Sequence, residues 1–306
     1  MNNSSTRTGK GMLAVFFKGM AMGIADSVPG VSGGTIAVMA GIYEELINSL
    51  KNLNPVTLWS YRKQGVMGFW RSINGNFLVL LLLGIVSALF ISANTVLYLL
   101  EFHYPALMAF FCGLVLASSW VLLRHVPSWQ LPQGLLFLLG AGITLLIAFI
   151  NPMAAQVSYW YLFLCGAIAI CAMILPGISG AFILLLLGVY DFVLSALRGL
   201  DFAVIVVFAS GCAIGLLSFS HLLSWTFEHY RDRAYAFLTG MLVASVVVLW
   251  PWKLVPEDAL IGVQYLTPAS YSAATGSSAT VLSVVVLFLI GFALVLFFER
   301  ISRKHA

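Results

Sequence analysis

Apolar residues run along this chain in long uninterrupted stretches, separated by short polar or glycine-rich segments. Three such stretches, Phe77 to Ile91, Gly134 to Ile150 and Val281 to Phe298, are as long as helices and contain no charged residue. A helix that crosses a bilayer needs about 20 mainly apolar residues, whereas buried strands have only about four to eight. The pattern therefore predicts an all-α polytopic membrane protein.

The same pattern occurs twice. With an offset of 147 residues, positions 18–54 align with positions 165–201, and the proline, glycine and serine residues of the central motif coincide in the two copies. The first copy reads VPGVSGGTIAVMAGIYEEL and the second reads LPGISGAFILLLLGVYDFV. Farther along, an offset of 127 residues aligns Gly84 with Gly211 and Gly113 with Gly240. Self-similarity at these offsets indicates a duplication that covers most of the chain.

Each copy is expected to contain a broken helical hairpin followed by three transmembrane helices. The first copy, residues 12–150, should hold a hairpin over 12–50 and helices over 77–98, 105–124 and 133–150. The second copy, residues 159–299, should hold a hairpin over 159–199 and helices over 203–226, 234–250 and 280–299. Residues 1–11 and 300–306 are expected to form cytoplasmic tails.

The arms of the first hairpin, roughly residues 12–27 and 35–50, have about 16 residues each. At about 1.5 Å per residue, such an arm is about 24 Å long, shorter than a hydrocarbon core of about 30 Å. We therefore expect a re-entrant hairpin that enters and leaves by one face. If each hairpin instead crossed the membrane completely twice, the orientation of all the remaining helices would be the same as with re-entrant hairpins.

Basic residues test this topology, because Lys and Arg gather in the cytoplasmic loops of membrane proteins. With same-side hairpins, 13 of the 15 basic residues fall on one face, and only Arg198 and Lys253 fall on the other. With a single crossing per hairpin the division would be 8 against 7. The charges therefore predict that both termini are cytoplasmic and that the two copies are inverted repeats.

Composition excludes several other classes of protein. Hydrophobic residues make up 61% of the 306 residues and charged residues 8%, and the mean hydropathy is +1.01, which a soluble domain does not reach. The net charge of +4 is spread over loops and termini, so we expect no nucleic-acid partner. The sequence has no nucleotide loop, nucleophile triad or metal-ligand spacing, and we expect no enzymatic activity, no cofactor and no metal site.

The repeated Pro-Gly-x-Ser-Gly segments are the candidate binding site. The pairs expected to break the two hairpins are Pro29, Gly30, Pro176 and Gly177. A new helix begins after each break, and its unpaired N–H groups suit an anion such as phosphate. The residues expected to bind the phosphate are Ser32, Gly33, Gly34, Thr35, Ser179 and Gly180. The alternative is that both segments are only tight turns whose hydroxyl groups cap the helices.

Three acidic residues in the hairpins are candidates for coupling or gating: Asp26, Glu44 and Asp191. Inverted repeats with broken helices are typical of secondary transporters, and ionisable groups at membrane depth often move ions there. Asp26 is expected either to relay a proton or sodium ion or to cap the backbone of its own hairpin. Glu44 and Asp191 occupy equivalent positions and are expected either to face the cavity or to lie in water.

The strings ADSVPGVSGGTIAVMAGIYEEL and LPGISGAFILLLLGVYDFVL resemble the paired signatures of the bacterial polyprenyl-phosphate transporter family, the undecaprenyl phosphate translocases. The resemblance covers nearly the whole chain. It implies a flippase of the bacterial cytoplasmic membrane that returns undecaprenyl phosphate from the outer to the inner leaflet, for reuse in peptidoglycan and other envelope polymers. By position, the family motif falls on Asp26, Pro29, Gly30, Ser32, Gly33, Gly34, Thr35, Pro176, Gly177, Ser179 and Gly180.

A small-anion carrier or channel that uses the same two tips is the alternative function. In the second tip, Ala181 stands where another small hydroxyl residue is expected, so this tip has one hydroxyl group fewer. The expected partners are a polyprenyl-phosphate lipid, the phospholipid bilayer, and a proton or sodium ion as coupling ion. The sequence leaves open whether the protein forms a homo-oligomer.

Overall fold

The computed structural model describes residues 9–26, 28, 31–53, 65–149, 157–254, 263–276 and 278–304, which are almost entirely helical. The helices are α1 (Gly9–Asp26), α2 (Gly33–Met39), α3 (Tyr43–Lys51), α5 (Gly65–Ser72), α6 (Gly75–Phe102), α7 (Tyr104–Leu123), α8 (Leu131–Phe149), α9 (Tyr159–Ile174), α10 (Gly180–Leu186), α11 (Tyr190–Gly199), α12 (Phe202–His229), α13 (Arg231–Val248), α14 (Pro268–Thr275) and α15 (Val281–Lys304). A short antiparallel pair, β1 (Lys253–Leu254) and β2 (Gln264–Tyr265), lies between α13 and α14.

Several of these helices suit a bilayer. Among the described residues, α7, α8 and α12 are long and apolar enough to cross a membrane, and two bent pairs, α5 with α6 and α10 with α11, raise the number to five if each forms one span. Shorter apolar runs lie in α9 and α15. The protein is therefore a helical polytopic membrane protein. Helix α1 already begins at Gly9, inside the tail expected over residues 1–11, of which residues 1–8 lie outside the described part.

The second arm of each hairpin is not a single helix, and this expectation was wrong. The arm divides at Gly41 into α2 and α3, and at Gly188 into α10 and α11, which are bent by 113°. The two glycines have φ of +66° and +67°, a left-handed conformation that favours glycine. In both copies the N–H of the next residue bonds to the carbonyl five residues earlier at 3.0 Å. This bonding pattern ends the short helix in both copies.

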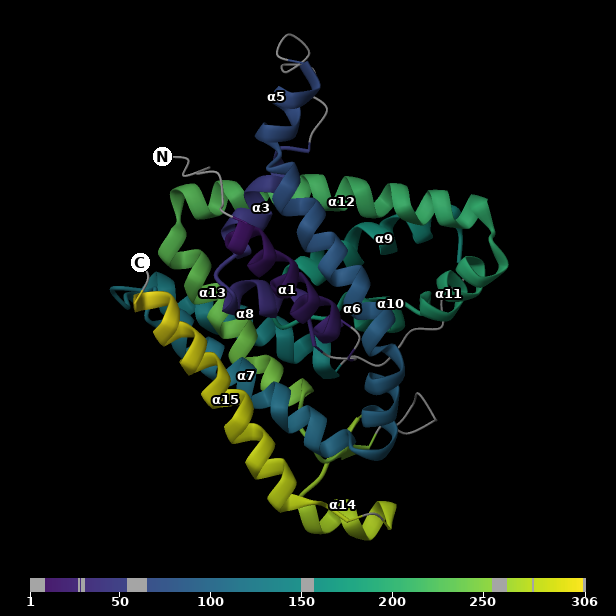
Figure 1. The fold of residues 1–306 in the computed structure, drawn as a ribbon. Helices are drawn as coiled ribbons and strands as arrows, with labels where there is room; N and C mark the ends of the chain where they lie inside the picture. Colours follow the sequence, from purple (N-terminus) through teal and green to yellow (C-terminus); the bar gives the residue numbers. More distant parts are fainter. Residues whose placement is uncertain are drawn as a thin grey trace.

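The long helices pack in equivalent pairs. Helix α1 lies against α6 as α9 lies against α12, and α7 lies against α15 as α13 lies against α8. Helices α7 and α13 also contact each other. In Figure 1 the C-terminal end of α15 and the α12–α13 junction lie on the left, and α11 lies at the right edge. The last long helix of each half of the chain therefore packs against a middle helix of the other half.

Glycine residues let these helix pairs approach closely. A Cβ atom at any of four glycines would overlap a carbonyl oxygen of the partner helix: Gly113 with Phe288, Gly240 with Phe137, Gly140 with Phe237, and Gly291 with Phe110. Gly113 and Gly240 are themselves related by the 127-residue offset of the sequence repeat. The backbone contacts between α7 and α15 are thus repeated between α13 and α8.

Helix α8 offers a direct test of this packing. We expect Gly140→Ala to destabilise the protein by about 1–3 kcal/mol, because its Cβ would meet the carbonyl oxygen of Phe237. Gly142, two residues along the same helix, has open space at its Cβ position, so Gly142→Ala should be neutral or slightly stabilising. Melting temperatures of the detergent-purified variants measure the difference. Equal melting temperatures for the two variants would contradict the assigned α8–α13 contact.

Candidate binding site at the two helix breaks

The first break lies between α1 and α2. Pro29 and Gly30, which were expected to make it, lie outside the described residues. Asp26 is the last residue of α1, and Ser32 is the N-cap of α2 in extended conformation, with φ of −125°. Ser32 and Thr35 are both buried, at 1% and 2% exposure. The hydroxyl groups expected at this tip therefore point into protein.

The N–H groups of the first tip are already bonded. The Gly33 N–H donates to a carboxylate oxygen of Asp26 at 2.6 Å, and the Gly34 N–H donates to the Ser32 hydroxyl at 3.1 Å. The Thr35 N–H donates to the Ser32 carbonyl at 3.0 Å. The expectation of unpaired N–H groups was thus wrong for this tip. In this conformation Asp26 supplies the anion that the helix start attracts.

The second tip has the same chain geometry but different bonding. Ser179 is the N-cap of α10, and its side chain makes no capping bond. The N–H groups of Gly180, Ala181 and Phe182 have no acceptor among the described residues. Helix α9 has no acidic residue at the position equivalent to Asp26, where Met173 stands. The second tip therefore presents the open donors that the sequence predicted for both.

The two tips contact each other directly. The Ser32 hydroxyl lies 3.1 Å from the Met173 carbonyl and 3.3 Å from the Leu175 carbonyl, and it donates to one of them at a time. The Gly177 N–H donates to the Thr35 hydroxyl at 3.0 Å. Segments about 140 residues apart in the chain thus meet at one place, as hairpin tips of a shared site would.

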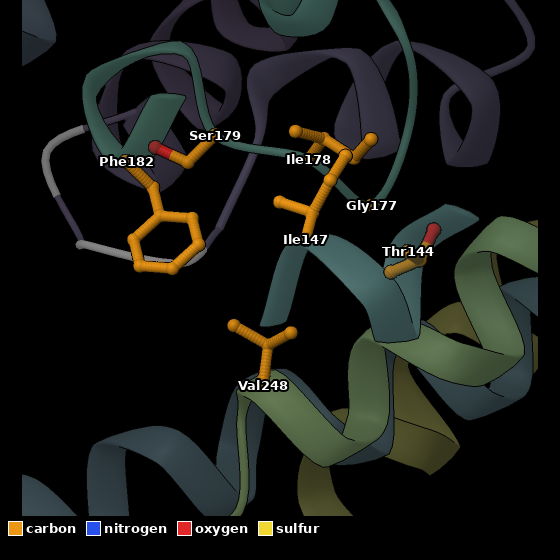
Figure 2. A pocket seen from close by; sticks show the side chains of 7 residues that line it. All are labelled: Thr144, Ile147, Gly177, Ile178, Ser179, Phe182 and Val248. Carbon is orange, nitrogen blue, oxygen red and sulfur yellow. The ribbon is translucent and has the colours of Figure 1, made fainter. Parts of the chain in front are cut away.

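A small cavity adjoins the second tip (Figure 2). Its volume is about 10 Å³, enough for one water molecule and too small for a phosphate group. Thr144 of α8 lines this cavity, is only 1% exposed, and has a hydroxyl without a hydrogen-bond partner. Figure 2 shows Thr144 and Ser179 on opposite sides, with Ile147 and Ile178 between them. A headgroup that reaches both hydroxyls therefore requires these two isoleucines to move apart.

Sequence reasoning missed Thr144. A lone threonine inside an apolar helix usually bonds back to its own helix, so the residue type alone carries no signal. The α7–α15 contact, in which Gly291 takes the place of Gly140, puts Val295 at the equivalent position. The one polar residue of this pair thus lies beside the tip that lacks a second hydroxyl. Knowledge of the helix pairing was needed to find it.

Glu44 does not lie at the tips. It lies in the first turn of α3 and accepts hydrogen bonds from Arg231 of α13, at 2.8 and 3.2 Å, and from the hydroxyl of Tyr235. Along the same interface, Lys51 forms an ion pair with Glu228 at 2.9 Å. These contacts tie α3 to the α12–α13 junction.

Further contacts extend this interface, and we call the whole interface the α3 latch. It consists of four residues of α3 and five residues of α12 and α13: Tyr43, Glu44, Asn48 and Lys51 against Ser224, Phe227, Glu228, Arg231 and Tyr235. The Ser224 hydroxyl lies 2.8 Å from the Asn48 side-chain oxygen. The rings of Tyr43 and Phe227 meet edge to face at 5.9 Å, but the Tyr43 hydroxyl is buried without a partner. Exposed ion pairs contribute about 0.2–1 kcal/mol each, and an unpaired buried hydroxyl costs about 1–3 kcal/mol, so the main stabilisation of the latch comes from the packing of the buried Tyr43 and Phe227 side chains.

Asp191 occupies the equivalent position in α11 but is exposed. Helix α3 packs along α12, and no comparable packing joins α11 to α6 among the described residues. The 127-residue offset puts Tyr104 where Arg231 stands, so the Glu44–Arg231 pair has no counterpart. The α3 latch therefore has no counterpart between α11 and α6 in the described part of the chain.

No cluster of three or more His, Cys, Asp or Glu side chains that could hold a metal occurs within the described ranges. What the tips offer is neutral hydrogen-bond donors, together with the single carboxylate of Asp26. Neutral donors of this kind are typical of sites that bind an anion without covalent chemistry.

Comparison with known proteins identifies the group to which this architecture belongs. Residues 22–260 match the family described as undecaprenyl phosphate translocase-like. A polyprenyl-phosphate transporter of Vibrio cholerae serotype O1 is 41% identical over 300 residues, which cover 95% of this chain and 97% of that protein. A polyprenyl-phosphate transporter of Staphylococcus aureus is 31% identical over 253 residues, covering 76% of this chain and 84% of that protein. No solved structure matches the chain.

Proposed function

We propose, since this chain belongs to the undecaprenyl phosphate translocase-like family of transporters, that it moves undecaprenyl phosphate across the bacterial cytoplasmic membrane. The direction is from the outer to the inner leaflet, which returns the carrier lipid for synthesis of peptidoglycan and other envelope polymers. The names of both relatives support a polyprenyl phosphate as the transported lipid.

The architecture behind this function is a pair of inverted repeats, residues 12–150 and 159–299, each led by a re-entrant hairpin. The repeated helix pairs and their matching glycine contacts support this organisation. The charge distribution supports cytoplasmic termini, with the first tip entering from the cytoplasmic face and the second from the opposite face. The contacts between the tips then bring both hairpins to one headgroup site.

The second tip is the observation that carries the proposal. Three N–H groups there have no acceptor among the described residues, the Ser179 hydroxyl makes no capping bond, and the unpartnered hydroxyl of Thr144 lies across the small cavity. Hydrogen bonds to a charged phosphate contribute about 1.5–3 kcal/mol each, enough to draw a headgroup from the bilayer surface. At the tips themselves the apolar tail needs no binding site, because a prenyl chain is stable in the surrounding lipid.

Asp26 controls whether the first tip can bind the headgroup. While its carboxylate holds the Gly33 N–H, a phosphate is excluded by like charge. Protonation, or a bound sodium ion, would release this hold and open Gly33, Gly34 and the hydroxyls of Ser32 and Thr35 to the headgroup. The headgroup would thus pass from the second tip to the first, with the proton or cation gradient giving the step its direction.

The α3 latch closes the cytoplasmic side in this scheme. With the latch formed and α11 apart from α6, the second tip is the one that a lipid from the outer leaflet reaches. Opening of the latch would then expose the first tip to the inner leaflet. Alternating access requires the latched and unlatched states to differ by only a few kcal/mol in free energy.

Proteoliposomes containing undecaprenyl phosphate test the proposal. We expect the wild-type protein to move the lipid, and both Ser32→Ala and Asp26→Asn to slow the movement by about tenfold or more, since each alters one headgroup or coupling contact. The asparagine introduced by Asp26→Asn keeps a side-chain oxygen for the Gly33 N–H, so the fold should survive. Ser210→Ala, at an exposed site on α12, is the matched control. Unchanged rates in both variants would contradict the site, and no movement with wild type would contradict the substrate.

A further inference from the structure

A second and larger cavity lies away from the tips, where α12 ends and α13 and α8 begin. Its volume is about 280 Å³, and its walls are mainly apolar side chains such as Leu136, Leu223, Phe237 and Leu238. No tip residue lines it. In Figure 1 the α12–α13 junction is on the same side as the C-terminal end of α15, the side to which the charge distribution assigns the cytoplasmic loops.

Arg233 is the one cationic residue of this cavity. Its side chain is exposed, its guanidinium lies 5.0 Å above the ring of Tyr230, and it has no carboxylate partner among the residues that the structure describes. The neighbouring Arg231, in contrast, is held by Glu44. The hydroxyl of Thr226 already donates to the Leu222 carbonyl at 2.8 Å. Among the described lining residues, the guanidinium of Arg233 is therefore the cationic group offered to a ligand at the edge of an apolar cavity, with Tyr230 beside it.

We propose that this cavity is an inner-leaflet docking site for an isoprenoid phosphate, with Arg233 on the phosphate and the first isoprenoid units in the cavity. The inference rests on the proposed function and adds the place where the lipid is held on the cytoplasmic side. A guanidinium pairs with phosphate through two parallel hydrogen bonds, while the apolar walls take a chain. The volume is just below the about 300 Å³ of small-ligand pockets, so it suits part of one chain rather than two acyl chains.

The cavity also shares a wall with the α3 latch. Phe227 lines the cavity, and the same ring packs against Tyr43 at 5.9 Å and Tyr235 at 5.5 Å. Tyr235 in turn donates to Glu44. An isoprenoid chain that enters the cavity therefore contacts Phe227, which is also part of the α3 latch. Release of the lipid is in this way coupled to opening of the α3 latch.

Binding of farnesyl phosphate to the full-length protein in nanodiscs, measured by native mass spectrometry, tests this site. We expect Arg233→Gln to weaken binding about tenfold or more, and Arg233→Lys to weaken it less. Leu136→Trp, which fills the cavity, should weaken binding without a change in charge. Arg124→Gln is the matched control, because Arg124 is another exposed arginine, paired with Glu299 at 3.7 Å. Farnesol and inorganic phosphate should each bind far more weakly than farnesyl phosphate.

Two results would overturn the site: binding that survives both Arg233→Gln and Leu136→Trp, or displacement of farnesyl phosphate by an equal concentration of phosphatidylglycerol. The second would identify an ordinary anionic phospholipid as the occupant. Lipid movement in wild-type proteoliposomes separates this inference from the proposed function. Movement without Arg233-dependent binding removes only the docking site, whereas Arg233-dependent binding without movement removes the transport function and leaves the site.

Discussion

Covalent attachment of α3 to α12 is expected to stop lipid movement almost completely, and cleavage of the attachment to restore it. The positions for this are Asn48 and Ser224, whose side chains are 2.8 Å apart in the latched state. Cysteines at both positions, joined by a reducible methanethiosulfonate cross-linker, would hold the cytoplasmic side closed. Transport by alternating access requires this side to open once per cycle, so a locked latch leaves no route for the headgroup.

The controls use the cysteines already in the chain. Cys112, Cys165, Cys171 and Cys212 lie in helices, so wild type treated with the cross-linker reports any effect that they cause. Each single-cysteine variant reports the effect of one modification without a bridge. If mass spectrometry shows the bridge and transport continues at the wild-type rate, the latch does not gate the lipid path.

Loss of the two hydroxyl groups at the second tip is the other large expected effect. We expect Ser179→Ala to slow undecaprenyl phosphate movement by about tenfold, and the double variant with Thr144→Val by about a hundredfold, because each hydroxyl supplies about 1.5–3 kcal/mol to a charged headgroup. Initial rates in proteoliposomes at equal protein content measure this.

Stability separates this role from a structural one. The hydroxyl of Thr144 is buried and unpartnered here, so Thr144→Val should leave the melting temperature unchanged or raise it. A variant that is at least as stable but slower has lost a headgroup contact rather than its fold. A Thr144→Val protein with the wild-type rate would show that this residue does not touch the lipid.

The sequence contained enough to identify the two tips. The repeated Pro-Gly-x-Ser-Gly segments pointed to Ser32 and Ser179 as helix starts, and both are N-caps in the structure. The glycines at Gly41 and Gly188 were also visible as a matching pair. The expected arm over residues 35–50 includes Gly41, and only the positive φ of Gly41 and Gly188 shows that a helix ends at each of them.

Contacts between segments that are distant in the chain could not be predicted from the sequence. The bond of 2.6 Å from the Gly33 N–H to Asp26, which makes this carboxylate a cap in the present conformation, is not contained in the order of residues. Glu44 and Arg231 are 187 positions apart, and nothing in either local segment indicates the pair. The two tips likewise bond differently despite similar sequences, since Asp26 has only Met173 as its counterpart.

Movement of undecaprenyl phosphate by the wild-type protein is the measurement that tests the central claim most directly. In proteoliposomes, the fraction of the lipid that an impermeant phosphatase can reach from outside reports its passage between leaflets, and uptake of inorganic phosphate into the same vesicles reports a small-anion path. The proposed function predicts that the whole lipid pool becomes reachable and that phosphate uptake equals that of protein-free vesicles. Phosphate uptake with an unreachable inner lipid pool would contradict it.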